Sequence, residues 1–309
     1  MALRTQAYAT TRGGFRTDIL PWRLFQRAKQ LTWDPADVDF SREAADWASS
    51  EDGTRRLVAR LATTFMVGEE AVTLDILPLL RAIADEGRIE EAMFLTTFLG
   101  DEAKHAEFFR TWFDVVGAPK DLDELLTDAQ RRVFDDELPR SMSRLDTDRS
   151  PEAFLDASLT YNHFVEGVLA MTGYWAWDRM FAMQEAFPGM RQGLDLVQRD
   201  ERRHLAYGTY LCRRIVAEHP ETWPFVEQKM SHLRDLGLKF VDDLGAAVFE
   251  DFRASAGEIT PEFDALAKAI IGEFTQYGEE LLERRINAIG VARGQSIDDV
   301  ESAAKEEEE

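Results

Sequence analysis

Apolar residues recur at spacings of three and four along most of the chain, and glycine and proline interrupt this pattern at only a few places. The periodicity predicts helices over residues 42–50, 53–85, 88–116, 122–145, 151–186, 190–218, 221–252 and 261–289. Pro78 lies inside the second helix and predicts a kink or a break there. Strands with a convincing alternation of polar and apolar residues are absent from the sequence, which therefore predicts an all-α protein.

The central predicted helices are long, each about 45 Å at roughly 1.5 Å per residue, which is typical of a large helical bundle. Residues 1–290 are expected to form a single domain, because no flexible linker divides them. Within this domain, residues 1–32 are expected to be an entry segment that leads into the bundle. The acidic residues 291–309 are expected to form a tail without regular structure.

Composition and charge exclude several classes of protein. The formal net charge of −22 over 309 residues disfavours binding to nucleic acid or anionic lipid, because their phosphates would be repelled. The sequence lacks the run of about eighteen apolar residues that a membrane helix needs, so no membrane insertion is expected. Its first residues contain no apolar block of the signal-peptide kind, so a cytoplasmic protein is expected. The single cysteine, Cys212, excludes an internal disulfide and any cysteine-rich metal site.

Two copies of a Glu-x-x-His motif occur in the predicted helices, and residues three apart share one helix face. The helix before each copy offers a further glutamate in an apolar setting. The motif residues and these glutamates are Glu69, Glu102, His105, Glu166, Glu201 and His204. Each motif can therefore direct a carboxylate and an imidazole at one ion.

Glu–His pairs at this spacing are common on solvated helix faces, so the motif alone would also fit a metal-free helical scaffold. The apolar neighbours of Glu69 and Glu166 favour a metal site, because an unpaired buried carboxylate costs several kcal/mol. Four carboxylates and two divalent cations cancel in formal charge. Oxygen-rich coordination with one imidazole per ion suits iron or manganese, and the arrangement is that of dinuclear carboxylate sites in ferritin-like bundles.

Residues beside the motifs have expected secondary roles. Asp101 and Asp200 are candidates to accept the outer N–H of a histidine across the bundle. Lys104 and the two arginines after Glu201 are expected to be charges on outer helix faces. His163 is expected to lie in the core without an assigned role.

The order of the six candidate ligands is shared by ferritins, fatty-acyl desaturases and bacterial monooxygenases. The segment from Trp33 to Arg42 and the Asp200-Glu201-x-x-His204 motif resemble the ribonucleotide reductase small-subunit superfamily. The resemblance implies a ferritin-like bundle with the metal pair in a four-helix core, and a homodimer. It also implies that Trp33 could pass electrons to the metals.

Within that superfamily the chain is most similar to the ligand-binding oxidases. The similarity lies in Gly68-Glu69-Glu70-Ala71-Val72-Thr73 and in Tyr161-Asn162-His163-Phe164-Val165-Glu166-Gly167. It implies a mixed Mn/Fe site, with Fe/Fe as an alternative, a long-chain fatty acid or similar ligand, and an ether between Val72 and Tyr161. Tyr161 precedes Glu166 by five residues, which is a looser fit to one helix face, and a local widening of that helix would help both to face the metals. Met171 and Tyr174 are candidates to line a channel for the ligand.

Two departures from the reductase pattern disfavour radical export to a partner. Phe109 occupies the position at which radical-storing subunits have a tyrosine, and no tyrosine follows Tyr277 in the sequence. The sequence therefore favours an O₂-activating oxidase that carries out two-electron C–H oxidation. A reductase small subunit without a radical tyrosine and a ferritin-like metal-binding protein are the alternatives.

Overall fold

The computed structural model describes residues 8–181, 186–256 and 260–303. Its α-helices are α1 (Leu20–Gln30), α2 (Glu43–Ser49), α3 (Asp52–Asp75), α4 (Leu77–Asp85), α5 (Ile89–Val116), α6 (Asp128–Arg131), α7 (Leu138–Ser143), α8 (Pro151–Ser158), α9 (Met171–Phe181), α10 (Pro188–Glu218), α11 (Trp223–Ala256), α12 (Pro261–Gly290) and α13 (Ile297–Ala303). Two π-helices, η4 (Arg132–Glu137) and η6 (Leu159–Ala170), continue from α6 and α8. Short 3₁₀ segments are η1 (Ala9–Thr11), η2 (Pro35–Asp37), η3 (Asp123–Leu125), η5 (Arg144–Asp146) and η7 (Pro220–Thr222). The described residues contain no β-strand, which confirms the all-α prediction.

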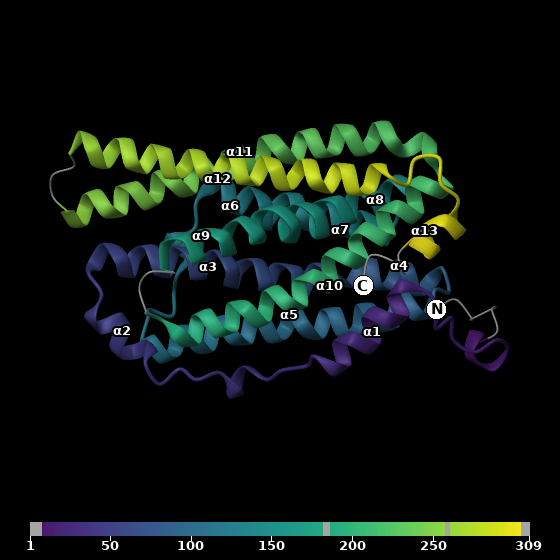
Figure 1. Cartoon of the computed structure of the whole chain (residues 1–309), viewed down its shortest axis with the longest axis horizontal. Coiled ribbons are helices and arrows are strands. Elements are labelled where there is room, and N and C mark those ends of the chain that lie inside the picture. The colour runs from purple at the N-terminus through teal and green to yellow at the C-terminus, as the bar shows by residue number, and fades with distance from the viewer. Residues whose placement is uncertain (1–7, 182–185, 257–259, 304–309) are drawn as a thin grey trace.

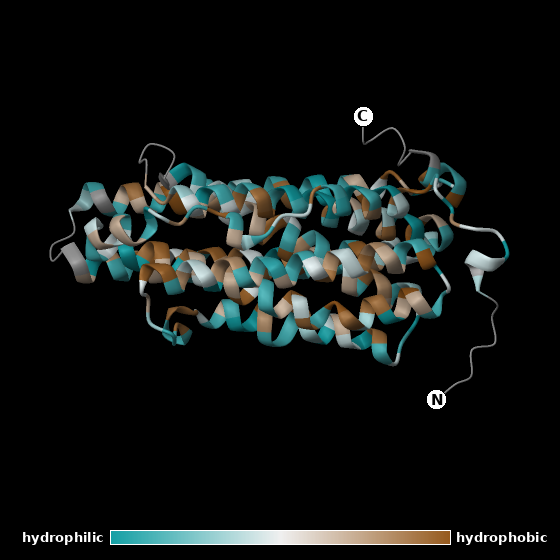
Figure 2. Ribbon diagram, turned by 90° about the horizontal axis from the view of Figure 1, so that it is seen from below, coloured by the Kyte–Doolittle hydropathy of each residue, from teal (hydrophilic) through white to brown (hydrophobic). Residues whose placement is uncertain are grey.

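The long helices run side by side to form an elongated bundle (Figure 1). Helix α3 packs against α5, and α10 packs against η6, so the four elements that carry the candidate ligands form the centre. The antiparallel pair α11 and α12 covers one side of this centre, where α11 contacts α3 and α12 contacts η6. Polar residues dominate the outward faces of the helices (Figure 2). None of the described helices is both long and apolar enough to cross a membrane.

Local sequence explains the main helix boundaries. The predicted break near Pro78 is confirmed, since α3 ends at Asp75 and α4 begins at Leu77 with proline in its first turn. Helix α5 stops at Gly117, whose φ of 71° is left-handed and suits glycine. The Ser150 side chain accepts a hydrogen bond from the Ala153 backbone amide, as expected of a helix cap.

The entry segment contains α1. Two predictions need correction. Residues 122–145 form several short helical pieces rather than one helix. Residues 297–303 form helix α13 instead of an unstructured tail, because Val300 is 2% exposed and Glu301 pairs with Arg16. The acidic residues 304–309 and part of the predicted helix over 151–186 lie outside the described residues.

Candidate metal centre

The six candidate ligands converge at the centre of the bundle, each at most 7% exposed. Helix α3 carries Glu69, α5 carries the first Glu-x-x-His motif, η6 carries Glu166 and α10 carries the second motif. Their ligand atoms form two groups, each within 4.8 Å: Glu69, Glu102, His105 and Glu201; and Glu102, Glu166, Glu201 and His204. Glu102 and Glu201 belong to both groups. The geometry therefore fits two adjacent cations that share two carboxylates.

Each histidine turns one ring nitrogen inward to the carboxylates. Nδ1 of His105 lies 3.2 Å from Glu69 Oε2 and 3.4 Å from Glu201 Oε1. Nδ1 of His204 lies 2.9 Å from Glu102 Oε1 and 3.6 Å from Glu166 Oε1. A neutral imidazole in this orientation can bind a cation through Nδ1 while its Nε2–H points away from the centre.

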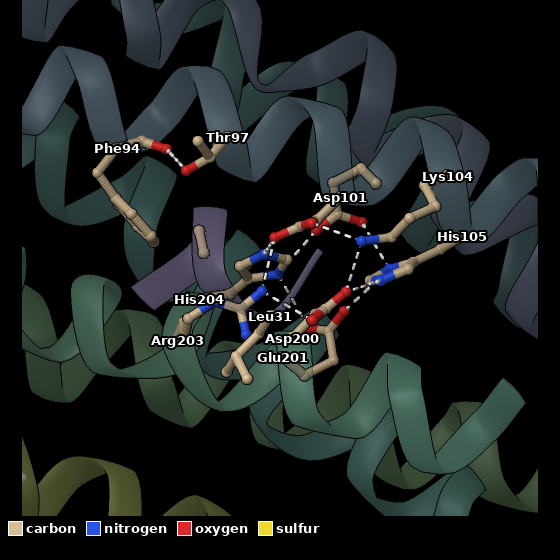
Figure 3. Close-up of polar contacts among 12 residues, drawn as sticks. Leu31, Phe94, Thr97, Asp101, Lys104, His105, Asp200, Glu201, Arg203 and His204 are labelled. Carbon is tan, nitrogen blue, oxygen red and sulfur yellow. Dashed lines mark hydrogen bonds and ion pairs between the residues drawn. The ribbon is translucent and has the colours of Figure 1, made fainter. Parts of the chain in front are cut away.

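The outer ring nitrogens meet the two aspartates that precede the motif glutamates (Figure 3). His105 Nε2 lies 3.2 Å from Asp200 Oδ2, and His204 Nε2 lies 3.5 Å from Asp101 Oδ2. Each aspartate comes from the helix opposite its histidine. Such carboxylate partners fix the ring orientation and the tautomer of a ligating histidine. Trp33 joins this arrangement, because its indole Nε1–H donates to Asp200 Oδ2 at 2.7 Å.

Two positively charged side chains, Lys104 and Arg203, bridge the two aspartates. The expectation that these side chains lie on outer helix faces is wrong. The Lys104 ammonium lies 2.6 Å from Asp101 Oδ1 and 2.8 Å from Asp200 Oδ2. The Arg203 guanidinium lies 2.9 Å from Asp101 and 2.7 Å from Asp200 (Figure 3). Their side chains are only 12% and 6% exposed. In the sequence, each of these side chains follows an aspartate by three residues, Lys104 after Asp101 and Arg203 after Asp200, and this spacing indicates an ion pair.

The raised pKa values and unpaired oxygens of the glutamates favour the binding of cations at this centre. Burial raises the pKa of Glu166 to about 8 and that of Glu102 well above its usual range, and the neighbouring Glu201 adds to both shifts. Buried oxygens of Glu102, Glu166 and Glu201 make no hydrogen bond to any described residue. Unsatisfied buried carboxylate oxygens that face one point are what divalent cations require. The donor set of carboxylate oxygens and imidazole nitrogens fits iron or manganese.

The π-helix explains how Tyr161 and Glu166 share a face. Element η6 has the i,i+5 repeat of a π-helix, so residues five apart lie one turn apart, as the expected local widening requires. Asn162 Nδ2 donates to Glu166 Oε2 at 3.1 Å and holds that carboxylate. Tyr161 is fully buried, and its hydroxyl has no hydrogen-bond partner among the described residues. Val72, 3% exposed, lies in the same apolar core cluster as Tyr161.

A cavity of about 480 Å³ adjoins the centre. One end contains the carboxylates of Glu69, Glu102, Glu166 and Glu201. The rest of its wall is almost wholly apolar and comes from α3, η6, α9, α11 and α12. Tyr174 lines the cavity as expected, whereas Met171 does not and packs instead against the core. The contribution of α11 and α12 could not be predicted from the sequence, because their apolar faces also look like ordinary core.

Two other residues lie as the sequence predicts. His163 is fully buried, and burial lowers its pKa to about 3, so it is neutral at physiological pH. Cys212 is fully buried, and burial raises the pKa of its thiol to about 12. Neither residue belongs to the two ligand groups.

Comparison with known proteins agrees with this geometry. Residues 19–246 match the family described as "Ribonucleotide reductase, small chain". A tyrosine-to-phenylalanine variant of an R2-like ligand-binding oxidase with an aerobically reconstituted Mn/Fe cofactor shares 33% identity and a TM-score of 0.83, over 92% of this chain and 98% of that one. A glycine-to-leucine variant with an anaerobically reconstituted Mn/Fe cofactor gives 33% identity and a TM-score of 0.84, over 93% and 98%.

A valine-to-isoleucine variant, also anaerobically reconstituted with Mn/Fe, gives 34% identity and a TM-score of 0.82, over 92% and 98%. These matches span nearly the whole of both chains at an identity that indicates common descent as well as a common fold. The chain belongs to the ribonucleotide reductase small-chain family and, within it, to the R2-like ligand-binding oxidases.

Proposed function

We propose that the protein is an O₂-dependent oxidase with a Mn/Fe centre, or Fe/Fe as the alternative, that binds a long-chain fatty acid or a similar ligand. The observation that carries this proposal is the cavity of about 480 Å³ with four carboxylates at one end and an apolar wall elsewhere. When bound, the metals would supply the electrons that reduce O₂ and the oxidising power for a C–H bond. Glu69, Glu102, His105, Glu166, Glu201 and His204 would hold them.

The shape and polarity of the cavity support an amphiphilic ligand. A carboxylate head group would complete the cation sites, and an alkyl chain would lie between α3, α11 and α12. Each buried methylene contributes about 0.8 kcal/mol, which is roughly a fourfold gain in affinity. Tyr174 lines the cavity, and its ring is held by stacking on Phe65 at a centroid distance of 4.9 Å, while Phe65 stacks on Phe109 at 5.4 Å.

The proposal includes an ether between the Val72 Cβ and the Tyr161 Oη. The reaction breaks the Cβ–H bond of Val72 and the O–H bond of Tyr161, and removes two electrons and two protons with O₂ as the oxidant. Burial, together with the negative charges of the nearby glutamates, raises the pKa of the Tyr161 phenol well above 10. Its hydroxyl proton is therefore retained until oxidation. The absence of any other described partner leaves that oxygen available to form the bond.

Aerobic reconstitution tests this proposal directly. Metal-free protein is loaded with Mn(II) and Fe(II), exposed to O₂, and its intact mass is measured. We expect a loss of two hydrogens, mapped to a linked peptide pair that contains Val72 and Tyr161. Tyr161→Phe should abolish the loss. Tyr174→Phe is the matched control, because Tyr174 is also buried beside the glutamates with an unpartnered hydroxyl, and it should keep the loss.

An unchanged mass in fully metallated, oxygen-exposed protein would contradict the ether. O₂ uptake measured in the same sample separates an oxidase without this crosslink from a metal-binding protein that takes up no O₂. Extraction of the purified protein and mass analysis of the released lipid test the ligand. A protein with no bound acyl chain and no affinity for added fatty acid would contradict that part.

A homodimer is also proposed. It is supported by two large apolar side chains on the outer surface where α3 meets α4, Leu74 at 63% and Leu77 at 50% exposed. Light scattering coupled to size exclusion should give twice the chain mass of 35.2 kDa. Leu74→Glu should shift the protein toward the monomer, whereas a charge at the equally exposed Leu266 on α12 should not.

A further inference from the structure

A series of aromatic rings leads from the metal centre toward α1. The His204 ring stacks on Phe98 with a centroid distance of 3.6 Å and an interplanar angle of 13°. Phe98 lies 5.8 Å from Phe94, and Phe94 lies 5.2 Å from Tyr207. Tyr207 is also one helical turn beyond His204 on α10, so the covalent path between them is short. All these rings are fully buried.

Tyr207 is the last ring of this series, and its hydroxyl is hydrogen-bonded to a carboxylate that can act as a base. Its hydroxyl donates to Glu91 Oε2 at 3.1 Å, and Glu91 is 1% exposed. The Glu91 carboxylate is held by Arg88, 3.2 Å away, and lies 3.9 Å from Arg214. The other three buried tyrosines, at positions 161, 174 and 210, have hydroxyls without a partner among the described residues.

This difference decides which buried tyrosine has a carboxylate that can take its proton when the ring loses an electron. A phenol that loses an electron becomes a strong acid, so its oxidation in a dry interior is costly unless the proton leaves at the same time. Glu91 is placed to accept that proton at hydrogen-bond distance. Tyr210, with its ring 6.5 Å from that of Tyr207 and no base on its hydroxyl, is not.

We propose that Tyr207 is an internal electron donor to the oxidised metal centre, with Glu91 as its proton acceptor. This inference rests on the proposed oxidase function. Tyr207 gives one electron to the metal pair, which is reduced by one electron, and its hydroxyl proton moves to Glu91 Oε2. The products are a neutral phenoxyl radical at Tyr207 and a protonated Glu91. Tyr207 thereby reduces an oxidised metal centre by one electron when the cavity holds no substrate. The radical that remains is buried and shielded from water.

The test is electron paramagnetic resonance after aerobic Mn/Fe reconstitution, without added ligand, in a Tyr161→Phe background that removes the competing phenol. The whole chain is produced with β-deuterated tyrosine and with ordinary tyrosine. We expect a tyrosyl signal whose hyperfine splitting narrows on deuteration. Tyr207→Phe should abolish the signal, whereas Tyr210→Phe, the matched control on the same helix, should keep it.

A second variant separates a redox role from a structural one. Glu91→Gln keeps an acceptor oxygen for the Tyr207 hydroxyl but cannot take up a proton at neutral pH. The radical yield should fall by about a hundredfold, the lower end of what a positioned base contributes. Metal content and thermal unfolding midpoint, measured on the same samples, show whether either variant has lost its fold. Because Glu91→Gln retains the hydrogen bond, a purely structural role predicts an unchanged yield.

The outcomes are distinguishable. A tyrosyl signal that persists in Tyr207→Phe overturns the inference, as does the absence of any such signal from protein that takes up O₂. In both cases the proposed oxidase function stands. Fully metallated protein that takes up no O₂ overturns the oxidase function and, with it, the donor role of Tyr207.

Discussion

Loading the metal-free centre with two divalent cations should expel at least about one proton at pH 7, from Glu166. Burial would lower the pKa of His105 and His204, but the carboxylates around them outweigh it and raise both pKa values well above 6.5. Burial also raises the pKa of Glu102 and brings that of Glu166 to about 8. Glu166 therefore holds a proton at pH 7 that ligation must remove, and the raised pKa values of Glu102, His105 and His204 favour further proton release.

The magnitude follows from the Glu166 proton. Because at least about one proton leaves when the two cations bind, each unit of pH should change the combined affinity for the pair by at least about tenfold. The sign is fixed, because protons compete with cations for the same atoms, so affinity rises with pH. Carboxylates on the surface are already ionised at pH 7 and release nothing when a cation approaches them.

Isothermal titration calorimetry with Mn(II) under anaerobic conditions, in buffers of different ionisation enthalpy, measures the proton count. Glu166→Gln is the control, because it removes the Glu166 proton and leaves the shape of the side chain. Release of at least about one proton in the parent, and about one fewer in this variant, is the expected result. Release of fewer than one proton would refute the reasoning, since the cations would then bind outside the buried cluster.

Three further predictions concern stability and the cavity. Burial raises the pKa of Asp75 to about 6, so its ionisation opposes folding: the contribution of this group to stability is greatest below pH 4 and is lost as pH rises through 6. Asp75→Asn should therefore stabilise the metal-free protein by about 1 kcal/mol at pH 7.5, after discounting for partial exposure, and by less at pH 5, in urea unfolding followed by circular dichroism. Gly193→Ala should destabilise the protein by about 1–3 kcal/mol in the same assay, because a Cβ there would lie 2.0 Å from the Phe108 ring. Gly272→Ala, whose Cβ would have nothing within 4 Å, should stabilise the protein by up to about 1 kcal/mol. Val248→Trp should narrow the cavity and weaken fatty-acid binding by about 0.8 kcal/mol for each displaced methylene. Equal affinities of the parent and the variant, measured by calorimetry across a series of chain lengths, would contradict the assigned binding site.

The sequence determined the helical architecture and the candidate ligand set. Helix positions followed from the apolar spacing of three and four, and the boundaries at Pro78, Gly117 and Ser150 followed from local chemistry. The two Glu-x-x-His motifs were readable because residues three apart on a helix must share a face, whatever the fold. The need for a widened helix before Glu166 also followed, from the spacing of five to Tyr161.

Tertiary structure decided everything that depends on which helix faces which. Lys104 and Arg203 looked like surface charges, because the sequence does not show that each lies between the aspartates of two opposite helices. The cavity wall from α11 and α12, the packing of α13, and the hydrogen bond from Tyr207 to Glu91 likewise join residues distant in the chain. Sequence periodicity records which face of a helix is buried, but the partner of that face is set by long-range packing, which no local pattern encodes.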